Sequence, residues 1–213
     1  MDGQTGARGR DCLRARRFMA AMIAAILITT GCQGMAKTTQ DVPARGNDRI
    51  DNTVADWPLK FVQHNFGAFS HSTRGITVDY DGFRHLSEPG DRLQLAASEA
   101  HPKSRANMPA GYLGVMNFPS PAKVLWRSSD GTELEADVDI AKIFNEQLIL
   151  HAVPREEVAE GVSIGNPDIL LEVDDRTINV YMRAFVPTKA LQTPGNPHSG
   201  HRRDLMLAWT RDY

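Results

Sequence analysis

Apolar and polar residues alternate along most of the chain from residue 56 onward, in short runs separated by turn-forming residues. A period of two is typical of strands with one buried face, whereas helices place apolar residues three or four apart. The clearest example joins residues 122–127 to residues 132–140 across Ser128-Ser129-Asp130-Gly131. Because Asp-Gly readily adopts the positive φ angles of a tight turn, this segment predicts a β-hairpin.

The second strand of this hairpin has one apolar and one acidic face. Leu134, Ala136, Val138 and Ile140 would point one way, and Glu133, Glu135, Asp137 and Asp139 the other. Side chains two apart on a strand lie about 6.6 Å apart, which is too far for a calcium site without other ligands. We therefore expect these carboxylates to be solvated, with docking of a basic partner as the functional alternative.

A second hairpin is predicted from residues 168–173 and 177–185, with its turn at 174–176. Further strands are expected at 59–69, 75–80, 111–117, 147–153 and 205–211, and short helices at 140–146 and 155–159. Short strands at this spacing are typical of all-β domains and not of alternating βαβ units. The predicted fold class is mainly β, an antiparallel β-sandwich of about eight strands with one or two short helices.

The first 31 residues have a different pattern. Five arginines within residues 1–17 precede an apolar run from Phe18 to Ile28, which is the arrangement of the n-region and h-region of a signal peptide. The run is shorter than the roughly 20 apolar residues that a transmembrane helix requires. Translation from Met1 retains these arginines, and starts at Met19 or Met22 are open alternatives that would discard them.

The apolar run ends in Ile28-Thr29-Thr30-Gly31-Cys32, which resembles the lipobox of bacterial lipoproteins. The resemblance implies cleavage before Cys32, a diacylglycerol on its thiol and a third acyl chain on its amine, so that acyl chains hold the protein at a membrane. Gln33 follows instead of the Asp that retains such lipoproteins in the inner membrane, so the implied location is the periplasmic face of the outer membrane. The predicted organisation is a signal peptide at 1–31, a lipidated cysteine and flexible tether at 32–55, and a β-rich globular domain at 56–213.

Composition and charge narrow the possible functions. With 41% hydrophobic and 23% charged residues, the 213-residue chain has the profile of a globular protein, which excludes a collagen-like, coiled-coil or wholly disordered chain. The net charge of −2 gives no electrostatic reason to bind nucleic acid. The two cysteines are Cys12 and Cys32, and cleavage would leave only Cys32, so no intramolecular disulfide is expected.

Residues Gly161-Val162-Ser163-Ile164-Gly165 spell the G-x-S-x-G motif of serine hydrolases. Candidate acids and bases follow in hydrolase order: Asp174, Asp175, His198 and His201. A nucleophile elbow needs a strand before the serine and a helix after it. Here a helical turn is expected before Ser163, and Asn166-Pro167 prevents a helix directly after it. A serine hydrolase using Ser163 is therefore a lesser alternative, and we expect no enzymatic activity.

Residues 192–204 form the segment of most unusual composition, a long loop that contains the candidate binding side chains His198, His201, Arg202 and Arg203, followed by Asp204. The two imidazoles could ligate zinc, but a zinc site requires three or four fixed ligands, and Gly200 with two prolines indicates a mobile loop. We therefore expect no metal and no cofactor. The remaining interpretations are a solvated connection or a protein contact in which the arginines pair with carboxylates.

Two parts of the domain, Trp57-Pro58-Leu59-Lys60-Phe61 with His64-Asn65-Phe66 and the stretch from Val124 to Gly131, resemble small Gram-negative periplasmic lipoproteins. Some of these serve as immunity proteins against secreted antibacterial effectors. The resemblance implies a lipid-anchored periplasmic protein that works by binding a protein, with inhibition of a secreted effector as the specific hypothesis. The 192–204 loop and the acidic strand are the candidate contact surfaces. A structural or accessory lipoprotein of an envelope assembly is the alternative.

Overall fold

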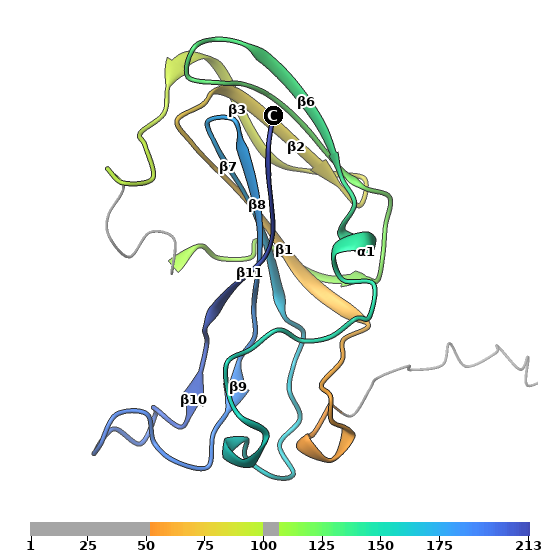
Figure 1. Cartoon of the computed structure of the whole chain (residues 1–213), viewed down its shortest axis with the longest axis vertical. Coiled ribbons are helices and arrows are strands. Elements are labelled where there is room, and N and C mark those ends of the chain that lie inside the picture. Colours follow the sequence, from red (N-terminus) through yellow and green to blue (C-terminus); the bar gives the residue numbers. More distant parts are fainter. Residues whose placement is uncertain (1–51, 100–106) are drawn as a thin grey trace, which may run out of the picture. The chain divides into compact units, whose positions relative to one another are not determined.

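The computed structural model describes residues 52–99 and 107–213, and these residues fold into two main β-sheets and a short two-stranded pair (Figure 1). The predicted start sites, signal peptide, lipidated Cys32 and most of the tether lie outside the described residues. Residues 52–55, which the sequence assigns to the tether, belong to the folded part. Asn52 is buried, and its side-chain oxygen accepts a hydrogen bond from the backbone N–H of Lys60 at 3.0 Å, while its amide donates to the Lys60 carbonyl.

The larger sheet has the strand order β11-β8-β7-β1-β4. Its strands are β1 (Gln63–His71), β4 (Tyr112–Met116), β7 (Asp168–Asp174), β8 (Thr177–Arg183) and β11 (Leu205–Asp212). β1 and β7 pair in parallel, from Asn65 opposite Asp168 to His71 opposite Asp174, and the other pairs are antiparallel. The mainly β sandwich is therefore confirmed, and the parallel β1–β7 pair is the one difference from the antiparallel pairing that the sequence predicts among the described strands. Long connections that visit the other sheet separate β1 from β7, and such connections permit parallel pairing.

The smaller sheet is antiparallel with the order β3-β2-β5-β6. Its strands are β2 (Arg74–Tyr80), β3 (Phe83–Leu93), β5 (Ala122–Arg127) and β6 (Glu133–Val138). The remaining elements are the short pair β9 (Val186–Pro187) and β10 (His201–Arg202), the helix α1 (Ile140–Ile143), and the single 3-10 turns η1 (Val54–Asp56) and η3 (Arg155–Glu157). None of the helices in the described ranges has the length and apolar character needed to cross a bilayer.

Both predicted hairpins are present. β5 and β6 pair from Ala122 opposite Val138 to Arg127 opposite Glu133, and Gly131 adopts a φ of 91° in the turn. β7 and β8 join through a tight turn in which Asp175 adopts a φ of 54°. Local turn chemistry determined these two connections, as the sequence indicates.

The structure differs from the predicted strands in three places: one strand is additional, one is absent and one begins later. β3 was not expected, because it is polar and largely exposed and contains Pro89. Residues 147–153 form no strand and contribute only an isolated bridge between Leu148 and Lys60. β1 begins at Gln63 instead of residue 59 because the backbone of Phe61 bonds to the carbonyl of Gln147 at 2.9 Å, outside the sheet.

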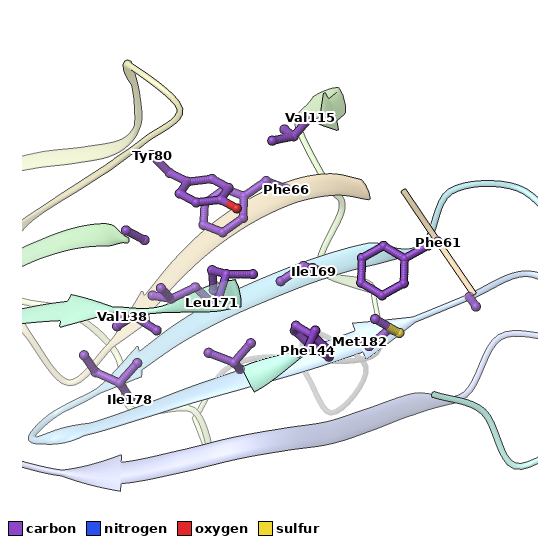
Figure 2. Close-up of a cluster of buried hydrophobic side chains, with 14 of the residues drawn as sticks. Phe61, Phe66, Tyr80, Val115, Val138, Phe144, Ile169, Leu171, Ile178 and Met182 are labelled. Carbon is purple, nitrogen blue, oxygen red and sulfur yellow. The ribbon is translucent and has the colours of Figure 1, made fainter. Parts of the chain in front are cut away.

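The main hydrophobic core lies between the two sheets. Figure 2 shows Phe66 from β1 lying against Tyr80 from β2, with Leu171 and Ile178 of the larger sheet beneath them. The ring centroids of Phe66 and Tyr80 are 4.5 Å apart. All four side chains are at most 2% exposed, so the alternating apolar faces of both sheets meet here as a β-sandwich requires.

A polar network is buried within this core around His64. Its Nδ1 lies 2.8 Å from the side-chain oxygen of Asn117, and its Nε2 lies 3.1 Å from the Tyr80 hydroxyl. The Asn117 amide donates to the Phe61 carbonyl at 2.8 Å, which orients its oxygen toward the imidazole. Nδ1–H therefore donates to Asn117 and Nε2 accepts from Tyr80, so the ring is satisfied in its neutral form. Burial lowers the pKa of His64 below its usual value.

This network predicts that acid destabilises the fold. Unfolded His64 takes up a proton near pH 6.5, whereas the folded ring does so only at lower pH, so the free energy of unfolding should fall as pH decreases below 6.5. The slope is up to about 1.4 kcal/mol per pH unit for each such histidine. Urea unfolding between pH 7.5 and 5.5 measures it. Burial also lowers the pKa of His151, so His64→Gln should reduce the slope without abolishing it.

The exposed His198 provides the matched control. His198→Gln should leave the pH dependence of unfolding as in the wild type. A slope that is the same in His64→Gln and in the wild type would contradict this account of the buried ring.

Candidate functional site

Several connecting segments gather at one end of the sandwich, at the bottom of the view in Figure 1 around β9 and β10. The segment after η3 is bonded to β9 and the residues that follow it, since Ala159 N–H donates to the Pro187 carbonyl at 3.0 Å and Val158 bridges to Thr188. The first described residues join the same region, where Ile164 N–H donates to the Asn52 carbonyl at 2.9 Å. Loops clustered at one end of a sandwich are a common location for binding surfaces.

The connection between β9 and β10, residues 188–200, consists of two successive tight turns. Asn196 N–H donates to the Thr193 carbonyl at 3.1 Å across Pro194 and Gly195, and Gly195 has a φ of 77°. This is the proline-glycine arrangement of a type II turn. Ser199 N–H then donates to the Asn196 carbonyl at 3.1 Å, which closes the second turn across Pro197. Pro194 and Pro197 each occupy the second position of a four-residue turn, where the fixed φ of proline favours the bend.

Ser199 connects the two turns. Its hydroxyl oxygen accepts a hydrogen bond from Thr193 N–H at 3.0 Å and lies 2.8 Å from the Asn196 carbonyl, to which it can donate. Its carbonyl accepts from Gln192 N–H at 2.9 Å. The side chain is 9% exposed. The sequence predicts a mobile loop here, whereas the structure shows hydrogen bonds to one buried serine on both sides of the loop.

Hydrogen bonds hold the backbone of the loop, whereas most of its side chains are exposed to solvent. Every residue from 189 to 198 is exposed, and Leu191 is 47% exposed. Residues 190–200 carry no charged side chain apart from a histidine that can be protonated, His198. An exposed loop with a fixed backbone loses less conformational entropy on binding than a mobile one. The arrangement can therefore present a defined surface to a macromolecule.

The candidate residues just after the loop have separate roles. His201 lies in β10 and its ring stacks on Phe185, with centroids 4.2 Å apart and planes at 22°. Phe185 is 50% exposed, so this stack adds an aromatic surface beside the loop. Arg202 pairs with Asp204 at 2.7 Å and does not offer a free guanidinium. The exposed Arg203 lies 3.8 Å from the Asp168 carboxylate.

Arg203 borders a pocket of about 520 Å³ on the outer face of the larger sheet, which Asp168, Arg183, Asn107, Pro109 and Ala110 also line. Arg183 is buried and donates to the Met108 carbonyl at 2.6 Å and to Asp168 at 2.9 Å. A Cβ built on Gly67 would lie 2.7 Å from the Pro109 carbonyl oxygen, so the backbone of this segment lies directly on the strand. These contacts hold residues 107–110 on the sheet.

A fully buried carboxylate lies on the same face. Glu172 of β7 is fully buried and accepts hydrogen bonds from the Tyr181 hydroxyl at 3.0 Å and from the Asn179 amide at 3.2 Å. His71 lies 3.6 Å from its other oxygen. The sequence does not mark this group, because a glutamate among apolar strand residues gives no spacing signal. The hydrogen bonds satisfy the carboxylate as a structural element of the sheet.

The acidic strand is oriented as expected. Glu133, Glu135 and Asp137 are exposed on β6, while Ala136 and Val138 are buried. Asp139 instead caps α1 by accepting a hydrogen bond from Lys142 N–H at 3.0 Å. In Figure 1, β6 lies at the opposite end of the view from β9 and β10. The four predicted carboxylates and the 188–200 loop therefore do not form one continuous surface.

The remaining candidate chemistry is not assembled into a site. Ser163 is exposed in an irregular segment between η3 and β7, and not at a strand-to-helix turn. Within residues 52–99 and 107–213, no three His, Cys, Asp or Glu side chains are grouped as metal ligands would be. The residues that the sequence analysis missed are Phe185, Leu191 and Ser199. Their only sequence signal is the turn chemistry of Pro-Gly, Asn-Pro and Ser.

Comparison of the chain with known protein families, with curated proteins and with solved structures found no match.

The Ser199 contacts predict a local effect of removing its hydroxyl. Ser199→Ala leaves the Thr193 N–H without its acceptor, which should lower the free energy of unfolding by about 1–3 kcal/mol. The ordered backbone should also loosen, so limited proteolysis within residues 189–198 should accelerate. Ser163→Ala, at an exposed serine in another loop, should change neither measurement. Equal protease resistance of Ser199→Ala and the wild type would contradict the proposed role of the hydroxyl.

Proposed function

We propose that this chain is a lipid-anchored periplasmic binding protein whose 188–200 loop contacts a protein partner. The observation that carries the proposal is the combination of a backbone fixed through Ser199 with side chains that are exposed from residue 189 to residue 198. Protein-binding loops commonly combine these two properties, because preorganisation lowers the entropic penalty of association.

The chemistry of the loop favours a protein over a nucleic acid. The segment offers prolines, amides, a leucine and a histidine, which suit apolar contact and neutral hydrogen bonds with another protein surface. The Phe185–His201 stack beside it supplies an aromatic group of the kind that dominates protein interfaces. Lys189 at the base of the loop is already paired with Glu160 at 2.8 Å, so little free positive charge is available there for phosphates.

The position of the first described residues relates the loop to the proposed anchor. Thr53, Val54 and Ala55 line a pocket together with Glu160 and Lys189. The chain therefore enters the folded part beside the base of the loop. With acyl chains on Cys32, a flexible tether would connect the membrane to the same end of the sandwich that carries the proposed contact surface.

Inhibition of a secreted antibacterial effector is the specific form of the proposal. An immunity protein requires an accessible, rigid surface that recognises one folded partner, and the 188–200 loop meets that requirement. The test is to direct the effector encoded beside this chain to the periplasm and to count survivors with and without the chain. Survival should rise when the chain is present, whereas unchanged killing would reject the immunity function and leave the envelope-assembly alternative.

The loop variants make this test specific. Leu191→Ala with His198→Ala removes exposed side chains from the loop, and it should abolish protection while the urea midpoint stays within error of the wild type. Leu113→Ala is the matched control, because Leu113 is 71% exposed on the edge strand β4, outside the loop. Protection that survives the loop substitutions but is lost in Leu113→Ala would place the contact elsewhere.

The anchor has an independent test. Cys32→Ser removes the thiol that would be acylated, so the variant should carry no acyl chain at residue 32. Mass spectrometry of the wild-type membrane form should show an acylated Cys32 at the N-terminus. An unmodified Cys32 with residues 1–31 still attached would contradict the lipoprotein proposal without affecting the loop proposal.

A further inference from the structure

The two sheets have four edge strands, and three of them carry features that discourage pairing with another chain. β4 is short and irregular, with Gly114 at a φ of 75° and a register shift against β1. β3 contains Pro89 and several charged residues. β6 presents the exposed carboxylates of Glu133, Glu135 and Asp137. Short length, irregularity, proline and charge are the usual devices that protect a sheet edge.

β11 lacks most of these features. It has eight residues, and its first five are apolar: Leu205, Met206, Leu207, Ala208 and Trp209. Leu207 is 55% exposed. β8 is the only strand that pairs with β11 among the described strands. A long apolar edge strand of this kind is suited to pairing with a further strand.

The hydrogen-bonding pattern shows which residues would pair. Tyr213 N–H donates to the Arg176 carbonyl at 2.9 Å, on the side of β8. Because bonding alternates along an antiparallel ladder, Thr210 and Asp212 direct their backbone N–H and C=O groups to the free edge. The register shift between Leu207 and Trp209 inserts Ala208 as an additional residue. Before Ala208, the same alternation directs the backbone N–H and C=O groups of Leu205 and Leu207 to the free edge.

The charges at the two ends of β11 are self-complementary. Arg203 and Asp204 precede the strand, and Arg211 and Asp212 end it. In an antiparallel pair of identical strands, the beginning of one strand lies beside the end of the other. The register that places Leu205 opposite Thr210 also places Arg203 opposite Asp212 and Asp204 opposite Arg211. A shift of one residue would instead oppose arginine to arginine or aspartate to aspartate, which is unfavourable.

We propose that a second copy of this chain pairs antiparallel along β11, which joins the two larger sheets into one continuous sheet in a symmetric dimer. The extra residue Ala208 makes this register possible. It reverses the alternation halfway along the strand, so Leu205 and Thr210 both face the outer side of the sheet and both bond outward. In this register Leu207 of one copy lies opposite Ala208 of the other at the symmetry axis. The interface is isologous, as in most homodimers.

Charge reversal tests the dimer and its register together. In Arg211→Asp, Asp204 would face an aspartate, and in Asp204→Arg, Arg211 would face an arginine. Each variant alone should dimerise at least about tenfold more weakly than the wild type, since two ion pairs become two repulsions. An equal mixture of the two variants should recover the wild-type dimer, because each heterodimer restores both opposite-charge pairs.

Sedimentation equilibrium of the full-length chain in density-matched detergent measures the association. Asp137→Arg reverses an exposed charge on β6 and is the matched control, which should dimerise as the wild type does. Three results would each overturn the proposal: a monomeric wild type throughout the concentration range, unchanged association of Arg211→Asp, or no recovery in the mixture. The proposal is independent of the loop contact, because the effector assay reads protection and this experiment reads only self-association.

Discussion

Hydrogen bonds to the buried Ser199 hydroxyl and carbonyl fix the surface on which our functional account depends. The residues between β9 and β10 would otherwise be a long exposed connection, and an ordered surface requires that its backbone groups find partners within the protein. Ser199 satisfies Thr193 and Gln192 on one side and reaches the Asn196 carbonyl on the other. Gln192 and Asn196 also use their side chains for hydrogen bonds within the loop, whereas the side chains of Leu191 and His198 are exposed and can contact a partner.

The sandwich provides the rigid base for this loop. Val186 and Thr188 at its start are buried, and β9 is bonded both to β10 and to the segment that follows η3. β8, which leads into β9, lies between β7 and β11 in the larger sheet. The loop therefore extends from a region whose packing is determined by the main core, as recognition loops on β-sandwiches do. The same sheet ends at β11. The sheet therefore supports the loop through its interior strand β8 and carries the proposed dimer contact on its edge strand β11.

The parts of the fold that the sequence predicts are those encoded locally. Asp130-Gly131 and the acidic residues of β6 define a hairpin and its two faces within one short segment, and the structure has both. β3 was missed because exposed charges hide its period, and the parallel pairing of β1 with β7 depends on a long-range contact that no local pattern encodes. In the candidate site, His198 could be selected from the unusual composition of residues 192–204, but the ordered backbone of the loop could not be predicted. It depends on Ser199 meeting Thr193 after two turns have already brought them together.

Amide hydrogen exchange of the free full-length chain tests most directly whether the 188–200 loop is ordered before any partner binds. The amides of Gln192, Thr193, Asn196 and Ser199 each donate a hydrogen bond within the loop. They should exchange at least about tenfold more slowly than the same amides in an unstructured peptide of this sequence. Exchange of all four at the rate of the free peptide would contradict the claim that this surface is preorganised.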